Sequence, residues 1–329
     1  MKEELLKLLK NTYPDYLSGE ELSTRFSVSR TAVWKWINQL KELGYTIESQ
    51  TNKGYRLTGV PDSLHGYELR PLLETELIGG NIIYFDSIDS TNMYIKREAD
   101  AGLEDGTVVI ADEQTAGRGR LGRGWVSSRG KGIWMSVLLR PQIDPSDASK
   151  LTLAAACAVC RGIRTVCGLE AAIKWPNDIV IGGRKVCGIL TEMNAEMDGI
   201  NYLVVGIGIN ANLEAGDFGE ELKQLATSLR IELGNNIERK YLAAAVINEL
   251  DKIYGSFVRS GNIADIMPEY RESSAVIGKQ VRLLQKGSEL IGKAVGINED
   301  GQLIIELEDG TLKEVMSGEV SVRGLYGYI

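Results

Sequence analysis

The first sixty residues place apolar side chains at helical spacing and then at the spacing of strands. Ser18 and Ser29 each precede a helical pattern and are predicted to cap the helices that begin there, because a serine hydroxyl accepts the free N–H groups of a first turn. In the helix after Ser29, Val33, Ile37 and Leu40 repeat on one face. The predicted elements are an apolar helix near residues 5–11, helices after Ser18 and Ser29, and strands at 45–49 and 54–57.

This order of elements is typical of a winged helix-turn-helix domain, whose third helix enters the major groove of DNA. Between residues 22 and 58, six basic side chains oppose two acidic ones, so this segment carries +4 in a chain of net charge −8. A local basic surface favours DNA as the partner. A winged helix that contacts only proteins is the alternative. The predicted DNA-binding residues are Ser29, Arg30, Thr31, Lys35, Lys53 and Arg56, the last two at or next to the hairpin tip.

Two further regions follow a short segment that contains Pro61. The first mixes strands and helices, and the second has short strands punctuated by Asp-Gly pairs, which predicts a small β-barrel. The predicted strands are 81–85, 107–111, 132–139, 202–209, 281–284, 289–295, 303–307 and 319–322, and the predicted helices are 92–101, 150–167 and 237–258. The predicted domains are therefore 1–62, 63–274 and 275–329.

Composition limits the class of protein. A chain of 329 residues with 25% charged and 43% hydrophobic residues is ordinary for a globular protein of two or three domains. The longest apolar run, Leu153–Cys160, is far shorter than the ~20 residues that span a bilayer. The first residues lack the apolar stretch of a secretory signal. We therefore expect a cytoplasmic protein with no membrane partner.

Four cysteines and one histidine limit the chemistry. Cys157 and Cys160 have the spacing of a zinc or redox pair, but they lie in an alanine-rich helical stretch without a second such pair. We predict buried structural thiols. A single histidine, His65, leaves little room for a Ser-His-Asp or Cys-His mechanism, so catalysis is expected to use lysine, arginine, aspartate and a metal ion bound with a substrate.

Residues 117–125, Gly-Arg-Gly-Arg-Leu-Gly-Arg-Gly-Trp, form the most distinctive stretch of the chain. Glycines let backbone N–H groups approach an anion, and arginine side chains bind phosphate or carboxylate oxygens in pairs. The stretch therefore predicts an anion-binding loop. A mobile basic surface loop or an RNA-binding arginine–glycine segment is the alternative, because glycine-rich motifs are weak evidence in isolation.

Four more segments of the central region carry candidate chemistry, although each also has an ordinary structural interpretation. Residues 89–92 (Asp-Ser-Thr-Asn) suit a helix cap, and 174–178 (Lys-Trp-Pro-Asn-Asp) suit a turn with an exposed charge pair. Lys185 in 183–188 suits a hairpin lysine in water. The two glycines of 205–210 suit a bulge, or a strand that a ligand approaches closely.

Taken together and in this order, these segments closely resemble the biotin protein ligases, and the N-terminal domain resembles that of the bifunctional class, in which the ligase is also a biotin-responsive repressor. The resemblance covers essentially the whole chain. It implies an α+β multi-domain fold, with a winged helix-turn-helix, a central mixed α/β ligase domain like that of class II synthetases and a C-terminal SH3-like barrel. It implies the substrates biotin and Mg-ATP, no metal fixed by the protein alone, and as partners a biotin carboxyl carrier protein, operator DNA and a second copy of the chain, bound when biotinyl-5′-AMP is present.

The resemblance also implies residue roles. The catalytic residues would be Lys185, Arg118 and Asp178, with Asp178 at the place of the acceptor lysine. The biotin-binding residues would be Ser90, Thr91, Asn92, Gln114, Arg118, Gly119, Arg120 and Lys185. The ATP-binding residues would be Arg120, Trp125, Asn210 and Arg323. Leu121 and Gly124 stand where other members carry basic residues, so this loop is less cationic.

The implied chemistry suits these residues. A carboxylate that attacks phosphorus needs no general base, and the barrier of charge repulsion is lowered by arginine, lysine and Mg²⁺. The reactive adenylate benefits from a covering loop, and an amine then displaces AMP, so no covalent enzyme intermediate is required. Two alternatives remain open at this point: a ligand-sensing transcription factor without ligase activity, and a lipoate-type ligase.

Overall fold

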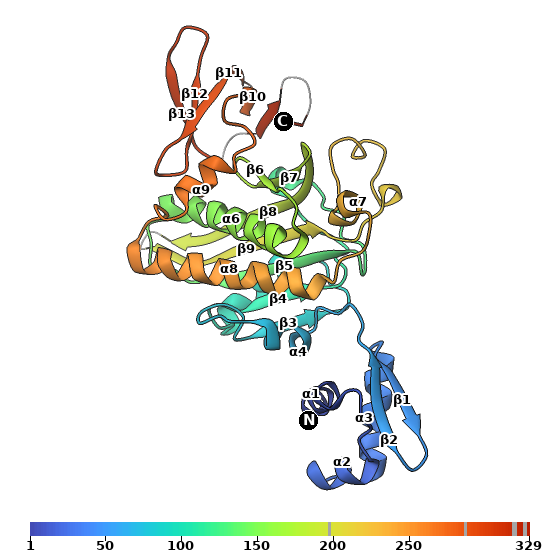
Figure 1. Cartoon of the computed structure of the whole chain (residues 1–329). Coiled ribbons are helices and arrows are strands. Elements are labelled where there is room, and N and C mark those ends of the chain that lie inside the picture. Colours follow the sequence, from blue (N-terminus) through green and yellow to red (C-terminus); the bar gives the residue numbers. More distant parts are fainter. Residues whose placement is uncertain (197–198, 286–287, 318–320, 325–327) are drawn as a thin grey trace. The chain divides into compact units, whose positions relative to one another are not determined.

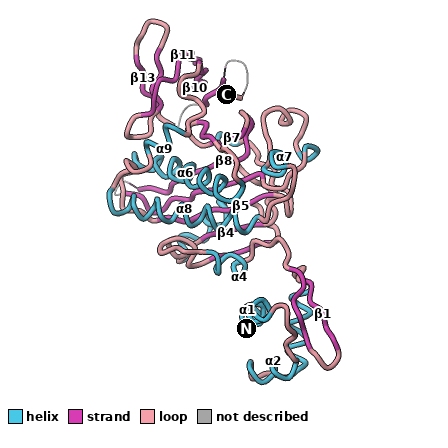
Figure 2. The backbone as a smooth tube through the Cα atoms, viewed as in Figure 1, coloured by secondary structure: helices cyan, strands magenta, loops and turns pink. Residues whose placement is uncertain are grey.

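The structure is a computed structural model that describes residues 1–196, 199–285, 288–317, 321–324 and 328–329. The chain divides into two compact units, Met1–Ser63 and Leu64–Ile329. Figure 2 shows that the second unit contains both a large sheet flanked by helices and a separate group of strands. None of the described helices is long and apolar enough to cross a membrane.

The first unit consists of three helices and a hairpin, as predicted. Its elements are α1 (Lys2–Thr12), α2 (Gly19–Arg25), α3 (Arg30–Glu42), β1 (Thr46–Gln50) and β2 (Gly54–Gly59). Both predicted caps are confirmed, because the hydroxyls of Ser18 and Ser29 accept hydrogen bonds from the first turns of α2 and α3 at 3.0 and 3.2 Å. The predicted apolar face of α3 is buried. The helix after the turn therefore presents its polar face to solvent.

The second unit is built on a seven-stranded sheet in the order β3-β4-β5-β9-β8-β7-β6, in which only β3 and β4 pair in parallel. Its strands are β3 (Ile82–Phe85), β4 (Val108–Ala111), β5 (Gly132–Leu139), β6 (Ala172–Lys174), β7 (Asp178–Ile181), β8 (Arg184–Glu196) and β9 (Gly199–Asn210). Its helices are α4 (Gly66–Leu69), α5 (Thr91–Glu98), α6 (Ala148–Cys167), α7 (Leu229–Leu233), α8 (Arg239–Ser260) and α9 (Met267–Glu272). The long helices α6 and α8 pack side by side on one face of the sheet (Figure 1).

Every second residue of the central strands belongs to the main hydrophobic core, which lies on one face of the sheet. In β9, Leu203, Val205, Ile207 and Ile209 belong to the core beneath α6 and α8. The residues between them turn to the opposite face, because successive side chains of a strand point to opposite sides. On that face α5 covers one end of the sheet, in a second apolar cluster that includes Val204. At the far end of the face, where β9 carries glycines, a third and smaller apolar cluster includes Trp134, and Trp125 packs against it.

The C-terminal strands form a five-stranded antiparallel sheet in the order β13-β12-β11-β10-β14. Its strands are β10 (Gln280–Gln285), β11 (Ser288–Ile297), β12 (Leu303–Glu306), β13 (Leu312–Val315) and β14 (Ser321–Gly324). Four of these strands overlap the predicted ones. The fifth, β13, carries only two apolar residues in four, which gives little strand signal.

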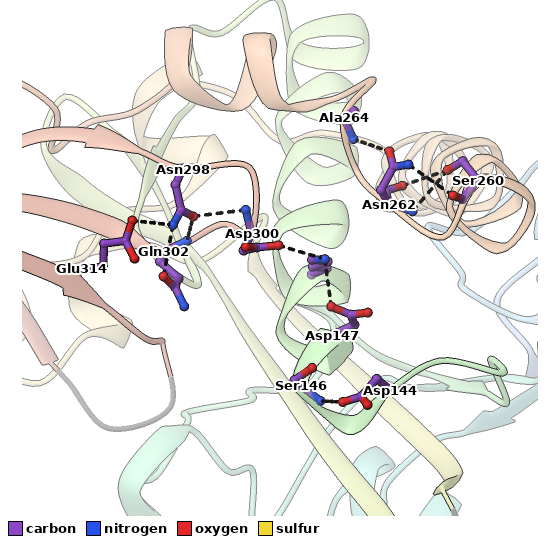
Figure 3. Close-up of polar contacts among 11 residues, drawn as sticks. Asp144, Ser146, Asp147, Ser260, Asn262, Ala264, Asn298, Asp300, Gln302 and Glu314 are labelled. Carbon is purple, nitrogen blue, oxygen red and sulfur yellow. Dashed lines mark hydrogen bonds and ion pairs between the residues drawn. The ribbon is translucent and has the colours of Figure 1, made fainter.

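The turn between β11 and β12 joins this sheet to the central domain. Lys150 near the start of α6 bridges Asp147 and Asp300, with Nζ–Oδ1 distances of 2.8 and 3.3 Å (Figure 3). Beside it, the Trp175 Nε1–H donates to the Gly301 carbonyl at 2.9 Å. Trp175 belongs to the Lys-Trp-Pro-Asn-Asp turn, so the C-terminal sheet contacts one of the segments that the sequence marks as chemical.

Candidate active site

A cavity of about 360 Å³ lies at the glycine-bearing end of the second face of the sheet. It brings together nearly all of the predicted ligand-binding residues. The predicted residues that line it are Ser90, Thr91, Asn92, Gln114, Arg118, Gly119, Arg120, Trp125, Asp178, Lys185 and Asn210. Arg323 lies in β14, where its backbone is paired with Arg282, but its side chain lies outside the described residues.

A chain of hydrogen bonds crosses the wall of the cavity at the start of α5. The Gln114 carbonyl oxygen accepts from the Thr91 N–H at 2.9 Å, and the Gln114 amide donates to Ser127 at 2.9 Å. Thr91 and Ser136 share a hydrogen bond of 2.6 Å, and the Ser136 hydroxyl donates to Asn92 Oδ1 at 2.5 Å. Such a connected network fixes the orientation of every member. These residues therefore offer a preorganised polar surface to a ligand.

Ser90 has the ordinary structural role that its sequence position also suggested. Its hydroxyl accepts a hydrogen bond from the Met93 N–H at 3.5 Å, which caps α5. Asn92, in the first turn of α5, donates from Nδ2 to Glu192 Oε2 at 2.9 Å. The junction between strand and helix thus serves as a cap and also lines the cavity.

The glycine–arginine loop closes on itself as a short hairpin-like turn. The Gly119 N–H donates to the Arg123 carbonyl at 2.8 Å, and the Trp125 N–H donates to the Gly117 carbonyl at 2.9 Å. Arg118 is exposed at the edge of the cavity. Arg120 instead reaches across it, donating to Asn177 Oδ1 at 2.8 Å and to the Ser317 carbonyl at 2.6 Å. The two arginines therefore occupy different settings, one open to solvent and the other tied to the C-terminal segment.

Lys185 and Asp178 form an ion pair inside the cavity, with Nζ–Oδ1 at 2.6 Å. Their side chains are 21% and 14% exposed, so the pair is largely withdrawn from water. The other carboxylate oxygen of Asp178 accepts a hydrogen bond from the Tyr328 hydroxyl. Lys174 is 3% exposed, and its Nζ lies 3.2 Å from the centroid of the Tyr328 ring. The hairpin lysine and the charged turn are therefore buried together, which rules out the solvent-exposed alternatives for both segments.

The charge state of Asp178 follows from these neighbours. Burial alone would raise the pKa of its carboxyl, but the Lys185 ammonium, the Tyr328 hydroxyl and Lys174 outweigh burial and lower the pKa below its usual value. Asp178 is therefore a carboxylate at neutral pH. A carboxylate of lowered pKa attracts a cation well and accepts a proton poorly, so this site is better suited to orienting an amine than to deprotonating it.

The two glycines of β9 make room for side chains rather than for a bulge. A Cβ at Gly206 would lie 2.3 Å from Asn92 Oδ1, and a Cβ at Gly208 would lie 2.6 Å from Trp125 Nε1. The indole of Trp125 thus lies close against the strand, with Lys185 Nζ 5.0 Å from its ring centroid. Trp125 Nε1 is buried and has no hydrogen-bond partner among the described residues. The close approach that the glycines suggested is real, and the group that approaches is the protein's own.

Asn210 closes the far end of the cavity. It is 4% exposed, and its Nδ2 donates to the Thr227 carbonyl at 3.0 Å. This bond ties the end of β9 to the segment before α7, which also lines the cavity. Asn210 thereby shapes the wall, and its predicted role at the nucleotide stays a prediction.

The predicted DNA-binding residues lie in the first unit. Ser29, Arg30, Thr31, Lys35 and Lys53 are exposed there. Arg30 pairs with Glu20 at 2.6 Å. The hairpin register places Arg56 opposite Glu48, in the third residue pair counted from the turn. Its guanidinium binds Glu48 at 2.6 Å and lies 4.6 Å from the Tyr16 ring centroid, and its predicted role at DNA stays a prediction.

The cysteines are free thiols, as predicted. Cys157, Cys160 and Cys187 are buried, and burial raises the pKa of the Cys160 thiol to about 12. Among the described residues, no group of three or more histidine, cysteine, aspartate or glutamate side chains is arranged to hold a metal ion.

Comparison with known proteins decides the family. Three family models match: a helix-turn-helix domain over residues 2–56, the biotin/lipoate A/B protein ligase family over 84–210, and the biotin protein ligase C-terminal domain over 276–323. The chain is 39% identical to the bifunctional ligase/repressor BirA of Bacillus subtilis, over 98% of each chain. It belongs to the bifunctional ligase/repressor family.

Two further relatives of this bifunctional ligase/repressor are similar to it, one over nearly the whole chain and the other over about three quarters of it. BirA of Escherichia coli is 31% identical over 97% of this chain and 96% of its own. The solved biotin protein ligase of Aquifex aeolicus in complex with biotin and ATP superposes with a TM-score of 0.65 at 32% identity, covering 74% of this chain and 99% of that chain. About three quarters of this chain therefore share a fold with a biotin protein ligase that was solved with biotin and ATP.

Two side chains at the site of this ligase/repressor escaped the sequence prediction. Ser136 is fully buried at the centre of the polar network, on a strand that otherwise reads as apolar. Alternation along β5 could have identified it, because Ser136 is a hydroxyl residue on the face opposite the core residues Met135 and Val137. Tyr328 lies beyond the last strand and carries no local pattern at all, so only the folded chain places it beside Asp178.

Proposed function

We propose that this protein is an ATP-dependent biotin ligase and a biotin-responsive transcriptional repressor. It forms biotinyl-5′-AMP and pyrophosphate from biotin and Mg-ATP, and it transfers biotin to a lysine of a biotin carboxyl carrier protein. The observation that carries the proposal is the buried Lys185–Asp178 pair, which lies in one cavity with the glycine–arginine loop and the polar network of α5. The 39% sequence identity to a bifunctional ligase/repressor, over 98% of each chain, supports the proposal.

In the first step, a biotin carboxylate oxygen attacks the α-phosphorus of ATP, the bond from this phosphorus to the bridging oxygen breaks, and pyrophosphate leaves. Lys185 and Arg118 supply positive charge where two anions meet, which is the main requirement of such a reaction. Mg²⁺ arrives with the nucleotide as part of the substrate. The head group of biotin contacts Ser90, Thr91, Asn92 and Gln114, whose network is already oriented.

The covering loop and the nucleotide wall form the rest of the proposed site. Gly119 and Arg120 cover the bound acid and phosphate, and Trp125 packs beside the adenine. Asn210 and Arg323 complete the nucleotide region. The contact between Arg120 and Ser317 supports this arrangement, because it brings the C-terminal segment to the edge of the cavity.

In the second step, the amine nitrogen of the acceptor lysine attacks the acyl carbon, the bond from this carbon to the phosphate oxygen breaks, and AMP leaves with the electron pair. The amine loses one proton to solvent. Asp178 orients the amine, and its lowered pKa supports this role over that of a base.

The same proposal extends to regulation and architecture. Bound adenylate favours a homodimer, which presents two winged helices to a palindromic operator; the ligand promotes dimerisation because the dimer binds it more tightly. We propose domains 1–62, 63–274 and 275–329, a class II synthetase-like centre, a C-terminal sheet that closes as an SH3-like barrel, and a cytoplasmic location. The five antiparallel strands support the barrel.

One experiment tests the first step directly. Purified protein is mixed with biotin and Mg-ATP, and the nucleotide product is identified by mass spectrometry. Biotinyl-5′-AMP is the expected product. Protein that binds biotin yet forms no adenylate would instead be a ligand-sensing transcription factor.

A lipoate-type ligase is the second candidate, because the matching family model includes lipoate ligases. Competition between biotin and lipoate in an ATP–pyrophosphate exchange assay separates the two. Exchange that depends on biotin and is insensitive to lipoate is expected.

A further inference from the structure

Tyr328 comes from beyond the C-terminal sheet and reaches the wall of the cavity. The end of the chain lies close against β14: a Cβ at Gly324 would lie 2.2 Å from the carbonyl carbon of Ile329. From there the Tyr328 hydroxyl donates to Asp178 Oδ2, and its ring lies beneath Lys174 Nζ. One side chain thus contacts both charged ends of the Lys-Trp-Pro-Asn-Asp turn.

These contacts divide the two oxygens of Asp178 between different partners. Oδ1 pairs with Lys185 and Oδ2 accepts from Tyr328, so the plane of the carboxylate is held from both sides. The ring face of Tyr328 also stabilises the buried Lys174 ammonium, because an aromatic face attracts a cation that has lost water.

We infer that Tyr328 is a positioning residue for the transfer step, holding the Asp178 carboxylate in the orientation that receives the acceptor amine. This inference rests on the proposed function and deepens it. The acceptor must approach Asp178 within the same cavity that holds the adenylate. A carboxylate that is fixed at both oxygens loses little conformational freedom when the amine binds. The transfer is faster because this loss does not add to the activation barrier.

The direction of the Asp178 pKa agrees with this role. The hydrogen bond from Tyr328 is one of the contributions that lower this pKa against the effect of burial. Removal of the hydroxyl would raise the pKa of Asp178, so a smaller fraction of the carboxyl would be ionised at a given acidic pH. A purely structural role for Tyr328 would leave that titration where it is.

The test compares Tyr328→Phe with a matched control, Tyr241→Phe. Tyr241 is 45% exposed on α8 and does not line the cavity, so its hydroxyl can be removed without touching the site. Adenylate formation is followed by pyrophosphate exchange with biotin and Mg-ATP. Transfer is followed separately, by mixing enzyme that carries preformed adenylate with a biotin carboxyl carrier protein and measuring single-turnover rates against pH.

In Tyr328→Phe the transfer rate is expected to fall about tenfold, the scale of one hydrogen bond to a charged group. Adenylate formation should fall far less, because the Lys185–Asp178 pair remains. A loss confined to transfer is a result that a purely structural role for Tyr328 would not produce. Tyr241→Phe should match the unchanged protein in both steps, and Tyr328→Leu, which also removes the ring, should lose at least as much transfer as Tyr328→Phe.

Three outcomes would overturn the inference. Unchanged transfer in Tyr328→Phe would show that the hydroxyl does not act. Equal losses in both steps would show that Tyr328 only holds the cavity together. Faster transfer would show that the phenol competes with the amine for Asp178. An unmodified protein that forms no adenylate, or transfers none, refutes the proposed function itself, so the two failures are distinguishable.

Discussion

The cavity of the second unit and the exposed face of α3 in the first both present positive charge, but in opposite physical settings. In the cavity, Lys185 and Lys174 are largely buried and each lies against a specific partner, Asp178 or the Tyr328 ring. On α3, Arg30 and Lys35 are exposed, and the pair that Arg30 forms with Glu20 lies in solvent. Coulomb interactions are far stronger in the interior than at a screened surface. We therefore expect the loss of one largely buried cation to abolish most of the adenylate formation. The loss of one exposed cation should only weaken DNA binding.

Lys185→Ala tests the buried side of this comparison and should have the largest effect. Adenylate formation is expected to fall by at least about 10²–10³-fold, the usual cost of removing one group that stabilises transition-state charge. Biotin-dependent ATP–pyrophosphate exchange measures it, with thermal unfolding as a check that the fold survives. Lys252→Ala, which removes an exposed lysine from α8, is the control. Near-normal exchange in Lys185→Ala would refute the assignment.

Asp178→Asn asks whether the buried pair also stabilises the fold. At neutral pH it should cost about 3 kcal/mol in free energy of unfolding, because Lys185 and Lys174 lose their shared carboxylate. The folded-state pKa of Asp178 is lowered, so its contribution is complete above the ordinary aspartate pKa of about 3.9 and is lost as pH falls through the lower folded-state pKa. Urea unfolding across pH measures it.

The matched control for that titration is Asp100→Asn, an exposed carboxylate of the same unit. It should leave the free energy of unfolding nearly unchanged at every pH. If the gap between the unchanged protein and Asp178→Asn kept its full size at the most acidic pH, the charge of Asp178 would not be its source.

Gly208→Ala is expected to have an intermediate effect. The added methyl group would lie 2.6 Å from Trp125 Nε1 and would push the indole off β9. Affinity for Mg-ATP should fall about tenfold, within the ~1–3 kcal/mol typical of overpacking. Calorimetric titration measures it, with Gly216→Ala as the control because a Cβ there meets nothing within 4 Å. Unaltered nucleotide affinity would mean that Trp125 does not lie beside the nucleotide.

Arg30→Ala tests the exposed side and should have the smallest effect. Affinity for duplex DNA selected by the protein from a random pool should fall, and the slope of its salt dependence should decrease by about one if Arg30 contacts a phosphate. Biotin transfer should be unaffected. Lys7→Ala, an exposed lysine of α1, is the control. A binding isotherm identical to that of the unchanged protein would show that this end of α3 does not meet DNA.

The two regions also differed in how far the sequence could predict them. The caps at Ser18 and Ser29 and the apolar face of α3 are local features with a fixed repeat, so the first unit followed directly from the pattern. The pairing of Arg56 with Glu48 was not predicted, because the register of a hairpin, and not the sequence of either strand alone, decides which residues lie opposite each other.

In the cavity, local pattern marked candidate segments, each with an ordinary structural alternative, but it did not give their setting. The Lys-Trp-Pro-Asn-Asp turn looked like a solvated charge pair, and its burial depends on Lys185 from the next hairpin and Tyr328 from beyond the last strand. Such contacts join residues far apart in sequence, and no periodicity records them. The family resemblance predicted that these segments form one site. Only the folded structure gives the distances between their side chains, such as that between Lys185 and Asp178.

The hydrogen-bonded chain through Gln114, Thr91, Ser136 and Asn92 has a consequence for inhibitors of this enzyme. Its members already hold one another in place, so a molecule that enters the proposed biotin site meets polar groups whose orientation is set before it binds. Compounds whose polar atoms match this fixed pattern are expected to bind tightly, and analogues that require one of these side chains to rotate are expected to bind weakly.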